Sequence, residues 1–250
     1  MSEPIRPDIA RVGFFHFGGR PSGRPVAQLR SCLSEKSKTT DFGDCMLVVP
    51  EAFNIAGIYS DARHEREIVD GLFDLSTKFK IAIVVGLMVD AERYGRWNTA
   101  CLIDGDKSHI LSGKIGQDLV GGYSTCCYFA PTRFRGQNFA ALICMDSVEN
   151  ISRFCPDRAA LQDLAQLWCT KLSKNLIMCV PAHFTTNTGK LPVDRWRNDC
   201  KMLVVSNSST EHPSVIYANG QLVIHPDADP DVFAKHPMTY VSEFADIPKM

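Results

Sequence analysis

The sequence lacks the features that would mark a membrane protein or a nucleic-acid-binding protein. It has no run of roughly 18 apolar residues, so we expect no membrane-spanning helix and no membrane partner. Its 27 basic and 28 acidic residues leave a net charge of -1 without blocks of like charge, and we expect no nucleic-acid partner. The segment Met1–Asp8 is polar and lacks the apolar stretch of a secretory signal, which predicts a cytoplasmic protein.

The cysteines lack the spacing of a metal site. There are 10 of them, but no pair has two residues between its members and none belongs to a Cys/His cluster of the zinc type. Several, such as Cys101, Cys144 and Cys179, lie in apolar strand-like runs, where a free thiol is a small core residue. We therefore expect mostly structural thiols and no metal.

No internal repeat, low-complexity tract or linker divides the chain. Its 250 residues, 45% of them hydrophobic, are enough for one core, and we expect a single domain over residues 1–250. Apolar strand-like runs alternate with helical patterns, which indicates an α/β fold with a mixed sheet layered by helices. The residues after Pro226 are expected to run over the surface. Strands are expected at 11–17, 45–49, 81–85, 98–103, 109–114, 138–143, 175–180, 202–205, 214–217 and 221–224, and helices at 25–36, 61–78 and 156–172.

Three polar residues lie where expected strands end. Glu51 follows the apolar run that ends at Val49-Pro50, Lys114 ends one strand of a hairpin, and Cys144 follows Ala141-Leu-Ile143. Strand ends are where α/β folds place their sites. A thiol attacks as the thiolate, a nearby cation favours that form, and a carboxylate can take the proton and later activate water. Each residue alone also has an ordinary structural explanation, and only the combination indicates catalysis.

The combination resembles the nitrilase superfamily of carbon–nitrogen hydrolases. The resemblance lies in Leu47-Val-Val-Pro-Glu51, in Asn98-Thr-Ala-Cys-Leu-Ile-Asp-Gly105 leading to Ser112-Gly-Lys114, and in Leu142-Ile-Cys-Met-Asp-Ser147. It implies a four-layer α-β-β-α sandwich with Glu51, Lys114 and Cys144 as the catalytic set and no metal or organic cofactor. It also implies a covalent thioester formed from a small amide, nitrile or N-carbamoyl substrate, resolved by hydrolysis or acyl transfer, and a homodimer formed through a helical layer.

The sequence departs from the family pattern between the lysine and the cysteine. Many members have a second glutamate there, whereas here Asp118 is the only acid between Lys114 and Cys144. We therefore expect no carboxylate other than Glu51 to contact the Lys114 ammonium. A backbone carbonyl or a hydroxyl, such as that of Ser124 or Thr125, would take its place, and a thioester should then accumulate.

Candidates for substrate contact are Tyr123 in the loop before Cys144, Met145 beside it, and His183 at a strand end. His183 also supports a second interpretation, a Cys–His hydrolase in which Cys144 and His183 react while Glu51 and Lys114 do not. A third interpretation is a catalytically degenerate binding module. Trp196, on a short helix, is expected to be structural.

Overall fold

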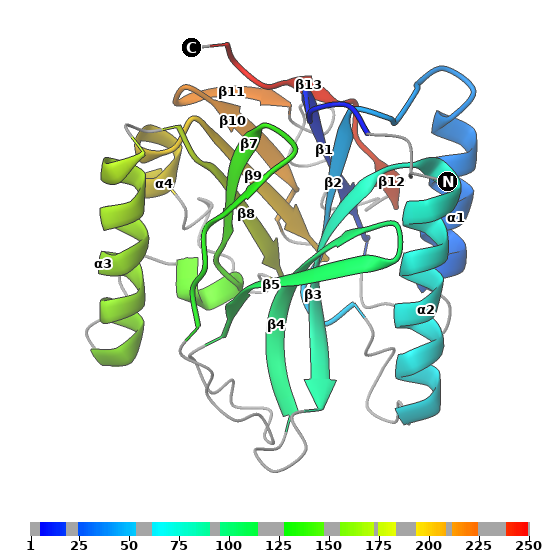
Figure 1. Cartoon of the computed structure of the whole chain (residues 1–250), viewed down its shortest axis with the longest axis horizontal. Helices are drawn as coiled ribbons and strands as arrows, with labels where there is room; N and C mark the ends of the chain where they lie inside the picture. The colour runs from blue at the N-terminus through cyan, green and yellow to red at the C-terminus, as the bar shows by residue number, and fades with distance from the viewer. Residues whose placement is uncertain are drawn as a thin grey trace.

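Two β-sheets face each other and helices cover their outer faces (Figure 1). The computed structural model describes residues 6–18, 25–53, 62–90, 96–114, 128–147, 156–172, 175–183, 194–208, 212–224 and 239–249. None of the helices among these residues is long and apolar enough to cross a membrane.

The first sheet has the strand order β12-β1-β2-β3-β4-β5, with β13 also paired to β1. Neighbouring strands β1, β2 and β3 are parallel, and β4 and β5 form an antiparallel hairpin whose turn contains Gly105 at φ 64°. The strands are β1 (Arg11–His16), β2 (Cys45–Val49), β3 (Ala82–Asp90), β4 (Arg96–Asp104), β5 (Lys107–Gly113), β12 (Tyr240–Val241) and β13 (Ala245–Asp246).

The second sheet has the order β11-β10-β9-β8-β7-β6, with β7, β8 and β9 parallel. The hairpin of β10 and β11 turns at Asn219 and Gly220, both with positive φ, as an Asn-Gly type I′ turn requires. The strands are β6 (Thr132–Phe134), β7 (Gln137–Ala141), β8 (Ile177–Ala182), β9 (Met202–Asn207), β10 (Val215–Ala218) and β11 (Gln221–Ile224).

Side-chain alternation along β2 shows why the sheets are layered. Met46 and Val48 pack toward the second sheet, whereas Leu47 and Val49 pack toward α1 (Pro25–Lys36) and α2 (Ala62–Phe79). A central strand covered on both faces needs apolar side chains at every position, and β2 is buried throughout. On the far side, α3 (Pro156–Lys171) and α4 (Asp194–Asp199) cover the second sheet. The molecule therefore has four layers.

The sequence predictions for the tail and for the strand before Pro181 were wrong. The tail after Pro226 does not only run over the surface, because β12 and β13 extend the first sheet by pairing with β1. Such two-residue strands are too short to leave a periodic pattern in the sequence. The strand expected to end at Pro181 instead continues to Ala182. It tolerates the proline because the pairing with β7 stops at Cys179, so that no ladder bond is needed from position 181 on that side.

Candidate active site

Glu51 lies in a tight turn that follows β2 and rests on β3. The Gly86 N–H donates to the Pro50 carbonyl at 3.2 Å, and the Phe53 N–H donates to the Gly86 carbonyl at 2.9 Å. A Cβ at position 86 would lie 2.6 Å from the Glu51 Cα, which is closer than real Cβ atoms come to backbone. Glycine at position 86 thus lets the turn approach β3 and sets the position of Glu51.

Lys114 follows β5 and reaches Glu51 across the buried end of the first sheet. The Lys114 ammonium donates to Glu51 Oε1 at 2.5 Å, and the Asn98 side-chain amide donates to the same oxygen at 2.6 Å. The Lys114 backbone N–H also donates to the Asn98 carbonyl at 2.8 Å. All three residues are buried, with 7% of Glu51 and 3% of Lys114 and of Asn98 exposed. The carboxylate and the ammonium are thus a desolvated, hydrogen-bonded pair.

Cys144 begins the 3-10 helix η1 (Cys144–Ser147), three residues after the end of β7, with φ 45°. A positive φ is uncommon for a non-glycine residue and costs conformational energy, so the surrounding structure must hold it. The Ser147 hydroxyl donates to the Cys144 carbonyl at 2.6 Å, and the Trp196 indole N–H donates to the Ser147 carbonyl at 2.9 Å. Trp196 of α4 thereby anchors the turn that carries Cys144.

The Cys144 thiol interacts with both partners of the Glu51–Lys114 pair. Burial raises the pKa of this thiol well above its usual value, and the negative charge of Glu51 raises it further. The Lys114 ammonium and the backbone N–H of His183 act in the opposite direction but are outweighed. The resting cysteine is therefore a thiol, not the thiolate that the nearby lysine alone would predict. Attack on a substrate requires transfer of the thiol proton to Glu51.

Of the three residues expected to contact substrate, the structure describes the side chain of His183 among its residues, but not those of Tyr123 and Met145. His183 follows β8, and its Nδ1 contacts the carbonyl oxygen of Ser208 at 3.0 Å and the Ser208 hydroxyl at 2.8 Å. Because a carbonyl only accepts, Nδ1 carries the proton in that contact. Tyr123 lies outside the described residues, and of Met145 only the backbone is described. The segment 115–127, with Asp118, Ser124 and Thr125, also lies outside, so the expectation that no second carboxylate contacts Lys114 stays a prediction.

Neither a protein-family model nor a curated protein matches the sequence, but solved structures do match the fold. An amidase from Nesterenkonia sp. superposes with a TM-score of 0.69 at 14% identity, covering 99% of this chain and 93% of that one. A cysteine-to-alanine mutant of the Nesterenkonia AN1 amidase, from the nitrilase superfamily, gives 0.68 at 13% identity, covering 99% and 94%. The chain has the nitrilase-superfamily fold. The four-layer α-β-β-α sandwich expected from the sequence is thereby confirmed.

A third similar structure concerns the chemistry of that neighbour. It is a glutamate-to-glutamine mutant of the AN1 amidase with the acetamide moiety of fluoroacetamide added covalently at its active-site cysteine. It superposes with a TM-score of 0.69 at 14% identity, covering 99% of this chain and 94% of that one.

Within this nitrilase fold, sequence reasoning did not identify two residues that hold Glu51 in place. Asn98 stood in the motif without a role, although an amide at the start of an otherwise apolar strand is a signal that it has a polar partner. Gly86 lies in the middle of the apolar run of β3, where an isolated glycine indicates close approach of another backbone. Both signals are local, but their partner, Glu51, lies 35 or more positions away in sequence.

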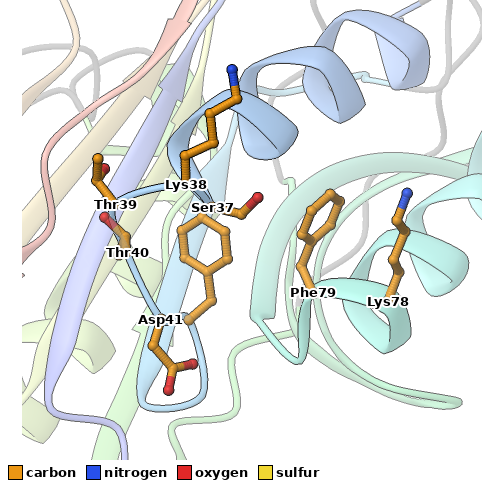
Figure 2. A pocket seen from close by; sticks show the side chains of 8 residues that line it. Ser37, Lys38, Thr39, Thr40, Asp41, Lys78 and Phe79 are labelled. Atoms are coloured by element: carbon orange, nitrogen blue, oxygen red, sulfur yellow. The ribbon is translucent and has the colours of Figure 1, made fainter.

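The described residues contain no group of three or more His, Cys, Asp or Glu side chains that could hold a metal ion. A surface cavity of about 460 Å³ lies elsewhere, between the ends of α1 and α2 (Figure 2). Asp41 and Phe42 of its lining precede β2, whereas Glu51 follows β2, so the cavity lies at the opposite end of that strand from Glu51. Its lining residues are Ser37, Lys38, Thr39, Thr40, Asp41, Phe42, Lys78 and Phe79.

Proposed function

We propose that the chain is a member of the nitrilase superfamily that hydrolyses a non-peptide carbon–nitrogen bond of a small amide, nitrile or N-carbamoyl compound. Cys144 is the nucleophile, Glu51 the general base and acid, and Lys114 the electrostatic stabiliser. The observation that carries the proposal is the buried contact of 2.5 Å between Lys114 and Glu51, together with the effect of both charges on the pKa of the buried Cys144 thiol. Covalent addition at the cysteine of the AN1 amidase, which has the same fold, supports the same chemistry here.

In the acylation half of the reaction with an amide, the Cys144 sulfur attacks the carbonyl carbon while its proton passes to Glu51. Negative charge develops on the carbonyl oxygen, where the Lys114 ammonium and the backbone N–H of Met145 are the proposed donors. When the tetrahedral intermediate collapses, the carbon–nitrogen bond breaks and Glu51 returns the proton to the leaving amine. The product of this half is a thioester on Cys144.

In the deacylation half, Glu51 takes a proton from water as the water oxygen attacks the thioester carbon. Collapse of the second tetrahedral intermediate breaks the carbon–sulfur bond, and the proton returns to the sulfur as the acid leaves. An acceptor other than water would give acyl transfer by the same steps.

Glu51 is a better candidate for the base than His183. The His183 ring uses Nδ1 to bind Ser208, and the His183 group that acts on the Cys144 thiol is its backbone N–H. The side chain that acts on the thiol most strongly is the Glu51 carboxylate, whose charge raises the pKa of the thiol. The buried polar groups of the site also argue against a degenerate binding module. Their desolvation costs free energy, and a protein without catalytic function would have no reason to keep them.

Intact-protein mass spectrometry after incubation with a panel of amides, nitriles and N-carbamoyl compounds tests the function. We expect a mass increase equal to one acyl group for at least one compound, with accumulation because deacylation is the slower half. Peptide mapping should place the acyl group on Cys144, and Cys144→Ala should carry none. Turnover that persists in Cys144→Ala, or acylation of Cys45 or Cys179 instead, would contradict the proposal.

We also propose that the chain forms a homodimer through α3. Leu164 and Leu167 are 39% and 48% exposed on this helix, and the half-buried Trp168 lies beside them at helical spacing. Apolar side chains that recur at three and four positions form one stripe along a helix, and a second copy can cover such a stripe.

Light scattering on the wild type should give twice the monomer mass of 27.8 kDa at micromolar concentration, and Leu167→Glu should give the monomer mass. Leu222→Glu is the matched control, because Leu222 is similarly exposed (49%) but lies on β11. A wild type of 27.8 kDa, or equal dissociation by both substitutions, would rule out the α3 dimer.

A further inference from the structure

Asn98 is the point at which two of the proposed catalytic residues meet. Its side-chain amide donates to Glu51 Oε1 at 2.6 Å, and its backbone carbonyl accepts from the Lys114 backbone N–H at 2.8 Å. It lies in β4, whereas Glu51 follows β2 and Lys114 follows β5. One residue therefore ties together the ends of two other strands.

We infer that Asn98 is a positioning residue that fixes one carboxylate oxygen of Glu51 and leaves the other free to move the proton of Cys144, an inference that rests on the proposed function. Oε1 already accepts two hydrogen bonds, from Asn98 and from Lys114. With Oε1 occupied in this way, Oε2 becomes the oxygen that takes the thiol proton and later the water proton. Because the amide side chain of Asn98 is short, it holds the Glu51 carboxylate with Oε1 as the accepting oxygen.

The role of Asn98 differs from that of Lys114, because the lysine has a second role in the proposed reaction. The ammonium is proposed to stabilise the oxygen of the tetrahedral intermediate, so its contact with Glu51 weakens as that charge develops. The Asn98 side chain is neutral and shorter than that of Lys114, and its hydrogen bond to Oε1 is maintained during that step. Glu51 then faces the Lys114 ammonium from the end of β5 and the Cys144 thiol from η1, with Asn98 as the neutral donor from β4.

The contacts of Asn98 also distinguish a role in positioning Glu51 from a role in stabilising the fold. The bond to Lys114 uses the Asn98 backbone and survives any substitution of the side chain. The side chain is 3% exposed, and among the described residues its Oδ1 has no hydrogen-bond partner. A buried amide with an unsatisfied oxygen is a poor choice for stability alone, since an apolar side chain of similar size avoids that cost. What the side chain supplies is the hydrogen bond to Glu51.

The test compares Asn98→Leu and Asn98→Asp with the wild type in two assays. The first is the pH profile of kcat/KM for an amide found to acylate Cys144, and the second is the pH profile of Cys144 alkylation by iodoacetamide, which needs no substrate. We expect Asn98→Leu to lower kcat/KM by about 100-fold, because the reacting oxygen is no longer oriented. The acidic limb of its kcat/KM profile should move to higher pH, because the ionised carboxylate loses a hydrogen bond. Its alkylation profile should move to lower pH instead, because a Glu51 that is less ionised raises the pKa of the Cys144 thiol less. Asn98→Asp should move the kcat/KM limb further to higher pH, because it puts a second negative charge beside Glu51.

Thr99→Val is the matched control. Thr99 is the next residue of β4, is fully buried, and donates its hydroxyl to the Leu87 carbonyl at 3.2 Å, so it tests the loss of a buried polar group from the same strand. Its acidic limb should stay at the wild-type pH. A lower rate in Asn98→Leu with an unmoved acidic limb, or an equal movement in Thr99→Val, would overturn the inference. If none of the amides, nitriles and N-carbamoyl compounds acylates the wild type, the proposed function fails, while the alkylation profile still decides whether Asn98 acts on Glu51.

Discussion

Glu51→Gln is expected to lower kcat/KM for amide hydrolysis by about 10²- to 10⁴-fold while Cys144 remains open to alkylation by small electrophiles. Glutamine preserves the shape of the side chain and can still contact Asn98 and Lys114, but it cannot take a proton. In the wild type the Cys144 thiol is protonated at rest, so acylation depends on a base that removes its proton during attack. Without that base, an amide with a poor leaving group should react very slowly.

Alkylation follows a different course because iodoacetamide needs only thiolate and no proton for its leaving group. The negative charge of Glu51 is one of the two main causes of the raised pKa of Cys144. Its removal therefore lowers that pKa, and the alkylation rate of Glu51→Gln should rise with pH as the thiol itself titrates.

Rapid-quench measurement of amide acylation and peptide mapping of alkylated cysteines, both over a pH series, separate the two effects. Cys45 and Cys179 serve as internal controls, because burial raises the pKa of both thiols without a contact to Glu51. Equal loss of acylation and alkylation in Glu51→Gln would mean that the glutamate only shapes the site. Undiminished amide turnover would mean that another group, such as His183, is the base.

The sequence predicted the parts of the fold that depend on local patterns. The helix over residues 25–36 and the strand over 45–49 have the predicted bounds, because apolar periodicity and the flanking breakers act within the segment itself. The turn at Asn219-Gly220 was predictable for the same reason, since few residue pairs accept two positive φ angles. Strand β6 was missed, because three residues are too few to show alternation.

The sequence indicated candidate residues for the site but not its electrostatics. Glu51, Lys114 and Cys144 could be selected because each lies at the end of an expected strand and their order resembles that of a known family. The raised pKa of Cys144 depends on burial and on the charge of Glu51, and neither can be read from the residues around position 144. The function of Asn98 and Gly86 likewise depends on contacts that only the folded chain creates.

Lys114→Met is expected to destabilise the fold by about 3–5 kcal/mol as well as to abolish amide turnover. The Glu51 and Lys114 side chains are only 6% and 2% exposed, so removal of the ammonium leaves a buried carboxylate without the cation that contacts it. Asn98 still donates to that carboxylate, but a neutral amide does not replace the charge. The same substitution should slow Cys144 alkylation, because Lys114 is one of the groups that lower the pKa of the thiol.

The double variant Glu51→Gln/Lys114→Met tests the physical reason for this loss. It replaces both charges with neutral side chains of similar size, so most of the stability should return while turnover stays absent. Urea unfolding at neutral pH gives the free energies, and Lys38→Met is the control, since the ion pair of Lys38 with Glu35 is largely exposed and should contribute about 1 kcal/mol or less. A Lys114→Met protein as stable as the wild type, or a double variant no more stable than Lys114→Met, would show that the buried charge pair does not govern stability here. Recovery of stability without activity would instead show that this pair is maintained for its chemistry, since a neutral pair supports the fold equally well.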